Sequence, residues 1–349
     1  MKICHVINSL SGGGAETHLL DLVYAQKELG HTVNVIATGP DKKNMKSFDK
    51  EFTHASDDVL RLYFPRLLNF YSYIKFFKHL KKEQFDLVHT HQPRSDFMYF
   101  ILNFFTSFKP TWIVSIHGKY DTYLEGSLFF DKLRKLSMPL LVKIWNKSDH
   151  IICISEEVEK WLTFYKIKSR TSVINYWINN AKLENLEKTK ESINIGFMGR
   201  INRNKGIEDL LEVYEELNED MYNLFIAGSG KESYLKKLND RYDLKNVNFL
   251  GYISNKDKFF SNIDIFVFPS YSEGLGLALL ESMSYSKICI SRDVPPMNSI
   301  LNHDSGYLFQ NIEELKSIIL DCRHLYKEDL SSLNKKLSNQ YNLLNEKYN

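Results

Sequence analysis

Short runs of apolar, β-branched and aromatic residues alternate with amphipathic helical stretches along the whole chain. This alternation is typical of βαβ units and predicts parallel sheets. The first half contains the candidate strands KICHVIN, TVNVIAT, DLVHTH, TWIVSIH, HIICIS and TSVINY. The second half contains INIGFMG, YNLFIAG, VNFLG, DIFVFPS, KICISR and GYLF. Helical patterns lie between most of these strands, for example at residues 15–29 and 206–218.

Two similar sets of strands predict an α/β fold with two Rossmann-like, doubly wound parallel-sheet domains that face each other across a crevice. A length of 349 residues agrees with two hydrophobic cores. The polar stretch 177–192 has no strand character and predicts a linker between a first domain at 1–176 and a second at 193–329. The polar tail 330–349 has a weak helical pattern, and its sequence leaves open whether it packs back on the first domain or frays.

The net charge of +2 gives no reason to expect a nucleic-acid partner, but the charge is uneven. Residues 1–150 carry 20 Lys and Arg against 15 Asp and Glu, and the remainder carries 25 against 28. The first half is therefore the part that we expect to meet an anionic surface. The N-terminal apolar stretch is too short for a signal peptide, and no window offers eighteen uninterrupted apolar residues. No disulfide or metal spacing joins the four cysteines, which favours a reducing, cytoplasmic location: Cys4, Cys153, Cys289 and Cys322.

Three consecutive glycines, Gly12 to Gly14, follow the first strand in the segment INSLSGGGAETHLLDL. Glycine costs backbone entropy, so this run needs a reason. The spacing differs from G-x-G-x-x-G, and no acidic residue ends the second strand, so a dinucleotide cofactor is a weak interpretation. A tight turn from strand to helix is the simple explanation. Close approach of a ligand to the backbone, with Glu16 just inside the helix, is the functional one.

The segment FVFPSYSEGLGLALLESM, residues 266–283, combines a strand, a glycine-containing loop and an apolar helix. Gly274 and Gly276 allow a phosphate to approach the backbone, and a helix start offers free N–H groups. Glu273 lies in the loop, and Glu281 lies on the helix, where an isolated carboxylate needs a partner such as ribose hydroxyls. An ordinary helix with one capping and one surface glutamate is the alternative.

Two cations follow the strand in IGFMGRINRNKGIEDLL, residues 195–211. Arg200 and Lys205 at the carboxyl end of this strand could neutralise a diphosphate, although a solvated basic loop explains either residue alone. Gly228 and Gly230 end the strand of LFIAGSGKES, and Tyr252 in VNFLGYIS could flank a base or simply pack.

His89 and His91 in VHTHQP lie on one face of a strand, so a metal site has to be considered. The sequence shows no third ligand nearby. We expect a structural or acceptor-side role for His91 and a packed side chain for His89.

The motifs GGGAE, IHG, ICIS, GR with NKG, AGSG, FLGY and the pair Glu273 and Glu281, in this order, resemble those of the family-4 retaining glycosyltransferases with the GT-B fold. The resemblance covers about residues 1 to 320. It implies transfer of a sugar from a nucleoside-diphosphate sugar, UDP-sugar favoured and GDP-mannose as a second choice, to an acceptor hydroxyl with retention of configuration. The implied acceptor is a glycan or a lipid-linked precursor of a bacterial capsule or lipopolysaccharide, and no metal or other cofactor is expected.

The resemblance also implies a role for individual residues. Glu281 would bind ribose hydroxyls, and His117 would hydrogen-bond the donor sugar near its 6-position. The catalytic set is Glu273, His117, Arg200 and Lys205. The donor-binding set is Gly13, Gly14, Gly228, Gly230, Tyr252, Ile253, Gly274, Leu275, Gly276 and Glu281. The acceptor-side set is Glu16, His91 and Arg94. Ser299 stands where most members of the family have a glutamate.

Three other classes stay open on the sequence: a nucleotide-sugar epimerase of the same fold, a dehydrogenase and a sugar-binding module without activity. A further expectation concerns the aromatic and basic residues at 61–85 and the apolar stretch that follows. They fit peripheral contact with an anionic membrane, and an ordinary amphipathic core helix explains them equally well.

Overall fold

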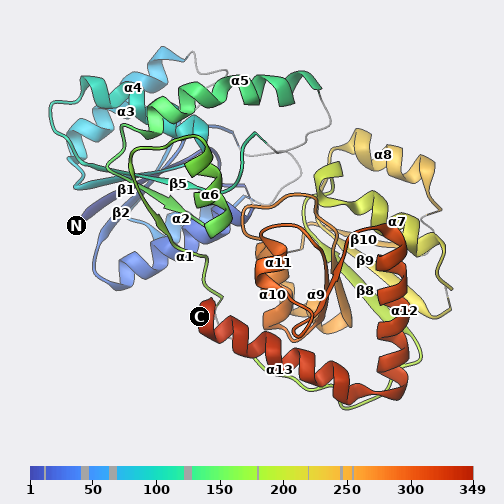
Figure 1. The fold of residues 1–349 in the computed structure, drawn as a ribbon. Coiled ribbons are helices and arrows are strands. Elements are labelled where there is room, and N and C mark those ends of the chain that lie inside the picture. Colours follow the sequence, from blue (N-terminus) through green and yellow to red (C-terminus); the bar gives the residue numbers. More distant parts are fainter. Residues whose placement is uncertain are drawn as a thin grey trace. The chain divides into compact units, whose positions relative to one another are not determined.

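The computed structural model describes residues 1–11, 13–40, 47–62, 69–121, 128–178, 181–218, 220–243, 247–253 and 255–348 (Figure 1). Gly12 and residues 63–68 of the predicted aromatic and basic segment lie outside these ranges. The chain forms two compact units. The first comprises Met1–Asp121 and Lys132–Asn175, and the second begins at Tyr176 and continues to the C-terminus.

The first unit is built on a parallel sheet of seven strands in the order β3-β2-β1-β4-β5-β6-β7. The strands are β1 (Lys2–Ile7), β2 (Thr32–Ala37), β3 (Asp58–Arg61), β4 (Leu87–His91), β5 (Thr111–Ile116), β6 (His150–Cys153) and β7 (Arg170–Val173). The sequence predicted all of them except β3. That strand has only four residues, with a charged residue at each end, and lies at the sheet edge, so it carries too little apolar pattern to be recognised.

Helices cover both faces of this sheet, as a doubly wound fold requires. They are α1 (Gly14–Glu28), α2 (Asp49–Ala55), α3 (Phe70–Glu83), α4 (Pro93–Phe105), α5 (Leu128–Trp145) and α6 (Glu156–Phe164). The chain runs outward from β1 to β3 and then returns to β4. Right-handed crossovers therefore place α1 and α2 on one face and α3 and α4 on the other (Figure 1).

The second unit has a six-stranded sheet in the order β10-β9-β8-β11-β12-β13, again with parallel pairing. Its strands are β8 (Ile193–Met198), β9 (Tyr222–Ala227), β10 (Val247–Gly251), β11 (Ile265–Phe268), β12 (Ile288–Arg292) and β13 (Tyr307–Phe309). Its helices are α7 (Ile207–Glu215), α8 (Glu232–Arg241), α9 (Lys256–Asn262), α10 (Leu277–Ser284), α11 (Met297–Ile300), α12 (Ile312–Glu328) and α13 (Leu330–Lys347), and a 3-10 turn, η2, spans Arg203–Lys205. These two parallel-sheet units match the predicted fold class.

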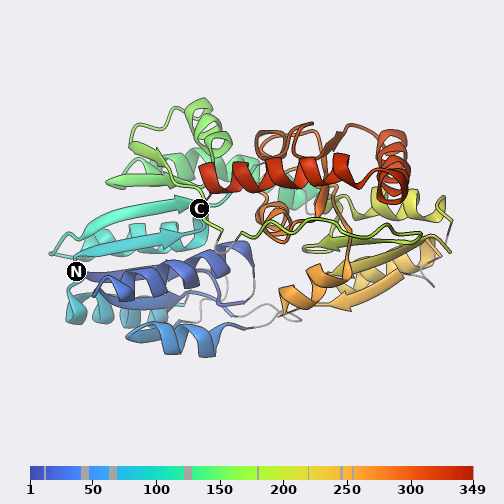
Figure 2. The ribbon, with the colours of Figure 1, turned by 90° about the horizontal axis from the view of Figure 1, so that it is seen from below.

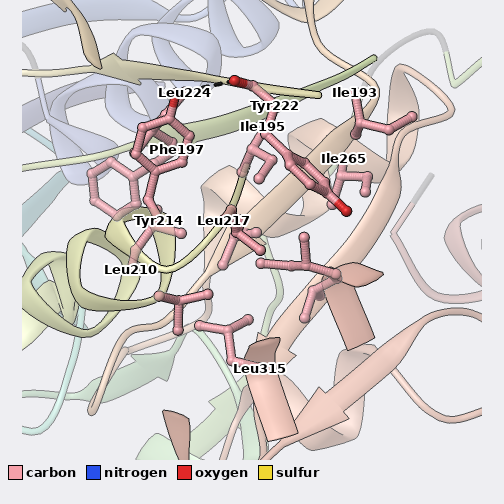
Figure 3. Close-up of a cluster of buried hydrophobic side chains, with 14 of the residues drawn as sticks. Ile193, Ile195, Phe197, Leu210, Tyr214, Leu217, Tyr222, Leu224, Ile265 and Leu315 are labelled. Atoms are coloured by element: carbon pink, nitrogen blue, oxygen red, sulfur yellow. Dashed lines mark hydrogen bonds between the residues drawn. The ribbon is translucent and has the colours of Figure 1, made fainter. Parts of the chain in front are cut away.

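The core of the second unit lies between its strands and the helices that cover them (Figure 3). Apolar residues of β8, such as Ile195 and Phe197, pack against Leu210 of α7 and Leu315 of α12. The hydroxyl of Tyr214 donates a hydrogen bond of 3.1 Å to the carbonyl of Tyr222, so the polar end of this buried ring is paired.

The predicted tail forms the helix α13, which packs against α10 and α12 (red in Figures 1 and 2). Its residues Leu333 and Leu337 belong to the core of the second unit. The tail therefore forms part of the second unit. The predicted linker is also tied to this unit, because Asn334 exchanges two hydrogen bonds with the backbone of Leu186.

Each sheet has one place where the strand order reverses. In the first unit it lies between β1 and β4, and in the second between β8 and β11. Ligands of open α/β sheets bind at the carboxyl ends of the strands beside such a switch point. Within the described residues, no helix has the length and apolar character needed to cross a membrane.

Candidate functional site

The switch point of the first unit is filled by histidines. His5 of β1 lies beside His89 of β4 in the strand register, and His91 follows two residues later on the same face of the sheet. All three side chains are buried. His117 follows the neighbouring strand β5 and is half-buried.

Hydrogen bonds join these rings to one another and to helix α1. His5 Nε2 lies 2.8 Å from Gln26 Oε1, and its Nδ1 lies 3.1 Å from His91 Nε2. His91 Nδ1 lies 3.1 Å from His117 Nε2. His89 is not part of this series, because its Nε2 pairs with Ser115 Oγ at 2.7 Å.

Burial keeps these histidines neutral. It lowers the pKa of His5 to about 4 and that of His117 to about 3. Burial lowers the pKa of His89 and His91 well below the usual range as well, with a further contribution from the neighbouring histidines. A charged imidazole would lose its hydration here, so the uncharged form is favoured.

The sequence showed no third ligand near His89 and His91, and the structure brings His5 to them. Ring nitrogens of His5, His89 and His91 all lie within 4.8 Å of one another. The sequence did offer a signal, since His5 interrupts the apolar strand KICHVIN and the first and fourth strands are neighbours in a doubly wound sheet. The expected packing of His89 agrees with its buried position.

The glycine run opens helix α1 at the same edge of the sheet. Gly13 is the N-cap residue with φ of −169°, an extended conformation that any residue can adopt. A Cβ there would come within 2.5 Å of Glu16 Oε2. Glu16 is buried and accepts a hydrogen bond of 3.4 Å from the side-chain amide of Gln92, which follows β4. The local reason for Gly13 is therefore the carboxylate of Glu16.

The three predicted acceptor-side residues come from neighbouring elements of the first unit. Glu16 lies in the first turn of α1, His91 ends β4, and Arg94 lies in the first turn of α4. Gln92 connects two of these elements through its hydrogen bond to Glu16. Gly14 is the first residue of α1 and is exposed.

The switch point of the second unit carries charges. Arg200 follows β8 and is exposed, and Lys205 ends the turn η2. The ammonium of Lys205 forms an ion pair with Glu273 of the loop after β11, and both side chains are largely buried. The prediction placed both residues at a diphosphate and a sugar, and the structure brings them into direct contact.

Side chains of two other segments form hydrogen bonds to the backbone of the loop at residues 269–276. The side-chain amide of Asn204 donates 2.9 Å to the carbonyl of Ser272. Arg292 at the end of β12 donates 3.0 Å to the carbonyl of Pro269, pairs with Asp209, and stacks over the ring of Tyr271 at 4.2 Å.

Two glycines let the loops approach each other closely. Gly228 has φ of +142°, and a Cβ there would lie 1.8 Å from the carbonyl oxygen of Gly199. Gly206 has φ of +64°, and its Cβ would lie 2.1 Å from the carbonyl oxygen of Pro269. Gly276, the N-cap of α10, also has a left-handed backbone with φ of +88°.

The remaining predicted donor-binding residues lie on α10 and in the segments that follow β9, β10 and β11. Glu281 lies on α10 and pairs with Lys256 of α9, with 2.5 Å between Oε1 and Nζ. Leu275 is buried before α10, Gly274 precedes it, and Gly230 forms an isolated β-bridge with Ile201 after β9. Tyr252 and Ile253 follow β10, where Tyr252 is 37% exposed. Ser299 is exposed on α11.

The sequence did not indicate several residues that support this site. Lys256, Asp209 and Arg292 do not belong to the glycines, loop glutamates and first cations after a strand that indicate an anion site. Only Arg292 had a visible signal, because an arginine that ends an otherwise apolar strand is costly to bury without a partner. The partner, Asp209, lies 83 residues away in the chain.

Comparison with known proteins gives matches along nearly the whole chain. Residues 12–182 match the family model described as Glycosyltransferase Family 4, and residues 179–340 match that described as Glycosyl transferases group 1. The chain is 24% identical to the O-antigen biosynthesis glycosyltransferase WclY of Escherichia coli, over 84% of this chain and 81% of WclY. It is 23% identical to the capsular polysaccharide biosynthesis glycosyltransferase CapM of Staphylococcus aureus, over 80% and 77% of the two chains.

Solved structures share the fold at lower identity. HepE of Anabaena, crystallised with UDP and glucose, aligns with a TM-score of 0.81 and 17% identity over 100% of this chain and 96% of HepE. Sucrose-phosphate synthase of Thermosynechococcus elongatus aligns with a TM-score of 0.79 and 19% identity, over 100% and 95% of the two chains. Because the two family models adjoin and between them span residues 12–340, the chain belongs to the group 1 glycosyltransferases of family 4, which have the GT-B fold.

Proposed function

We propose that the protein moves a sugar from a nucleoside-diphosphate sugar, with UDP-sugar favoured over GDP-mannose, to an acceptor hydroxyl with retention of anomeric configuration. The observation that carries this proposal is the pair of Lys205 and Glu273 beside the start of α10. A cation, a carboxylate and free helix N–H groups there match a diphosphate joined to a hydroxyl-rich sugar. The relatives WclY and CapM are named for polysaccharide biosynthesis, which supports a glycan precursor as acceptor.

The diphosphate would replace Glu273 as the partner of Lys205. A phosphate oxygen offers the ammonium an equivalent negative charge, and Arg200 adds a second cation at the end of β8. Glu273 then becomes available to accept hydrogen bonds from hydroxyls of the donor sugar. Gly206 and Gly228 let the loops at this edge of the sheet pack with their backbones in close contact.

Glu281 would hold the ribose of the donor. Its carboxylate now pairs with Lys256, which is 37% exposed at its side chain and can move into solvent. Two ribose hydroxyls can donate to the two oxygens of one carboxylate, so the exchange keeps Glu281 paired. Tyr252 and Ile253, which follow β10, would lie on the base side of this nucleotide.

Breaking the bond to the diphosphate is the difficult step. Negative charge builds up on the leaving phosphate, and positive charge builds up on the sugar ring. Lys205, Arg200 and the N-terminus of α10 would stabilise the phosphate charge through preorganised electrostatics. The acceptor hydroxyl would attack from the side of the departing group and give its proton to a phosphate oxygen. His117 would hydrogen-bond the donor sugar near its 6-position, with Glu16, His91 and Arg94 on the acceptor side.

A panel of nucleotide-sugars tests this function. The purified protein is incubated with UDP- and GDP-sugars, with and without glycan and lipid-linked acceptors, and the products are analysed by mass spectrometry and NMR. We expect one donor class to be consumed with an acceptor present and the product to keep the donor's anomeric configuration. An inverted product contradicts the retaining mechanism, and conversion of the donor to an isomer without acceptor indicates an epimerase.

We also propose that the first unit contacts an anionic membrane that carries the acceptor. Large apolar side chains stand exposed on α3 and α4, where Phe70 is 76% and Phe105 is 71% exposed, and Leu136 of α5 is 68% exposed. Exposed lysines lie on α3 and α5: Lys75, Lys78, Lys81, Lys82, Lys132, Lys135 and Lys143. Apolar and basic side chains together fit a surface of anionic lipids. One relative, 25% identical over 88% of this chain and 75% of its own length, is the alpha-monoglucosyldiacylglycerol synthase of Streptococcus pneumoniae.

Sedimentation with vesicles tests this contact. The protein should sediment with vesicles containing phosphatidylglycerol at low salt, and the variant K75E/K78E/K82E should remain in the supernatant. The matched control K231E/K236E/K237E changes as many charges around α8 of the second unit and should sediment like the unmodified protein. Absence of binding at low salt, or equal loss in both variants, contradicts the proposal.

A further inference from the structure

The ion pair of Lys205 and Glu273 joins two loops of the second unit. Lys205 ends the turn η2 after β8, and Glu273 lies in the loop of residues 269–276 after β11. The two loops also touch through their backbones, because a Cβ on Gly206 would come within 2.1 Å of the carbonyl oxygen of Pro269. The separation of the two charged groups therefore depends on how these loops are held.

Arg292 at the end of β12 binds the carbonyl of Pro269 as well. Its Nε donates a hydrogen bond of 3.0 Å to this oxygen, and its Nη1 donates 3.4 Å to the carbonyl of Gln310. Its Nη2 pairs with Asp209 in the first turn of α7, the helix that follows the turn of Lys205. Only 8% of the Arg292 side chain is exposed. One buried, planar guanidinium thus connects the loop after β11, the start of α7 and the end of β13.

Tyr271 connects the loop to the same carboxylate. Its hydroxyl donates 2.7 Å to Oδ2 of Asp209, the oxygen that also accepts from Arg292. The guanidinium carbon of Arg292 lies 4.2 Å from the centroid of its ring, in a cation–π contact. Its backbone N–H donates 2.9 Å to the carbonyl of Asn204, the residue before Lys205. The side chain of Tyr271 therefore ties the loop to α7, and its backbone ties the loop to η2.

Stability alone is a weak reason for a buried ion pair. The cost of removing two charges from water offsets most of their attraction, so such a pair contributes little net free energy of folding. A guanidinium instead gives geometry, because its planar fork fixes the directions of its N–H groups, which the flexible ammonium of lysine does not. Since Arg292 is buried and directs its nitrogens at protein oxygens, it is placed to orient loops rather than to receive a phosphate.

We propose that Arg292 and Asp209 are positioning residues that keep Lys205 and Glu273 at the separation required by the diphosphate and the sugar of the donor. The inference rests on the proposed function, in which Lys205 contacts the diphosphate and Glu273 the sugar. When the diphosphate replaces Glu273 as the partner of Lys205, the ion pair that joined the two loops is lost. The buried pair of Arg292 and Asp209 takes no part in this exchange, so the loops stay in position while the donor binds.

Arg292→Lys tests the proposal, because it keeps the charge and removes the planar group. We expect kcat/KM for the donor to fall about 10- to 100-fold, since Lys205 and Glu273 lose their fixed geometry. KM for the donor should rise. Affinity for the nucleoside monophosphate, measured by calorimetry with UMP and GMP, should stay unchanged, because this ligand lacks the distal phosphate and the sugar. Loss of folded protein alone would lower kcat and leave KM constant.

Arg323→Lys is the matched control. Arg323 of α12 lies 3.8 Å from a carboxylate oxygen of Glu191 and donates 3.0 Å to the backbone carbonyl of the same residue. Glu191 precedes β8, whereas the two loops follow the ends of β8 and β11. The control should keep kcat, KM and both affinities. Equal effects in the two variants, or an equal loss of monophosphate and donor affinity in Arg292→Lys, contradicts the proposal.

Hydrogen exchange of the ligand-free, full-length protein tests the loops without any donor. The amide of Tyr271 should exchange about tenfold faster in Arg292→Lys, because its hydrogen bond to Asn204 opens more often. Unchanged exchange together with weaker donor binding would show that Arg292 contacts the phosphate itself, which contradicts a positioning role. Absence of donor binding by the unmodified protein contradicts the proposed function instead, and the exchange measurement then still decides how the loops are held.

Tyr271→Phe keeps the test valid if Arg292→Lys does not fold. It removes one hydroxyl, the donor to Asp209, from a residue that is 47% exposed. We expect kcat/KM for the donor to fall about three- to tenfold, with monophosphate affinity unchanged. Unchanged kcat/KM together with unchanged exchange of the loop in this variant contradicts the proposal.

Discussion

The two switch points have the same topology and opposite electrostatics. In the first unit, neutral rings such as His5 and His91 fill the junction of β1 and β4 and bond to one another. In the second, Lys205 and Glu273 face each other at the junction of β8 and β11 as charged groups. Neutral hydrogen-bonded rings are less costly to bury than ions, while ion pairs can exchange partners when an anion arrives. The difference fits a hydroxyl-binding first unit and a phosphate-binding second unit.

The largest effect is expected from removing the cation of the second switch point. Lys205→Met should lower kcat for sugar transfer by about 10²- to 10³-fold, because one preorganised partner of the leaving phosphate is lost. Steady-state kinetics with the best donor measures this. Lys316→Met is the control, since Lys316 pairs with Glu216 in an exposed salt bridge. Similar losses in the two variants would show that Lys205 acts through stability.

As the pH falls, the first unit should lose stability at a higher pH than the second. The histidine pKa values are lower in the folded state, about 4 for His5, while unfolded histidines take up protons below about pH 6.5. The neutral rings therefore make their full contribution to stability above pH 6.5, and this contribution is lost as the pH falls to about 4. For His5 alone the loss is about 3 kcal/mol. Hydrogen exchange with mass spectrometry should show earlier loss of protection in β1 and β4 than in β8 and β11.

Asp96 of the same unit has the opposite effect on the pH dependence of stability and serves as the control. Burial raises the pKa of Asp96 to about 7, so its stabilising contribution grows as the pH falls towards 4. The variant Asp96→Asn should consequently lose protection in β1 and β4 more steeply on acidification. Loss of protection at the same pH in both units would contradict the electrostatic difference between them.

A smaller effect is expected at Glu281. Glu281→Gln should raise KM for the donor about ten- to a hundredfold, because charged hydrogen bonds to the ribose become neutral ones. Affinity for the free nucleotide, measured by calorimetry, should fall by the same factor. Glu216→Gln removes a carboxylate from an ion pair away from the switch point and should change neither value. An unchanged KM in Glu281→Gln contradicts its assignment to the ribose.

The smallest effect is expected at Gly13. Gly13→Ala should destabilise the protein by about 1 kcal/mol in denaturant unfolding, because the new Cβ displaces the flexible carboxylate of Glu16. Nucleotide affinity of the second unit should stay unchanged. The double variant Gly13→Ala/Glu16→Ala measures the coupling between the two positions. Strictly additive losses would show that Gly13 is needed for another reason than the space that Glu16 occupies.

The sequence predicted the fold class and twelve of the thirteen strands seen in the described part of the chain, because buried parallel strands are continuous apolar runs between helical patterns. It also pointed to Lys205 and Glu273 as candidates for the site, because both lie in loops that follow a strand, where α/β sheets carry ligands. Their pairing could not be predicted, since 68 residues separate them and either could have faced solvent.

The local order of residues by itself determined where strands and helices form and which polar groups end them, since both follow from neighbours within a few positions. Only the tertiary structure decided which polar groups meet. His5, His91 and His117 become one hydrogen-bonded series because β1, β4 and β5 are adjacent in the sheet, although 86 residues separate the first two and 26 the last two. Their neutral state follows from the same arrangement, because burial, which lowers each pKa, exists only once the strands have paired and α1 has covered them.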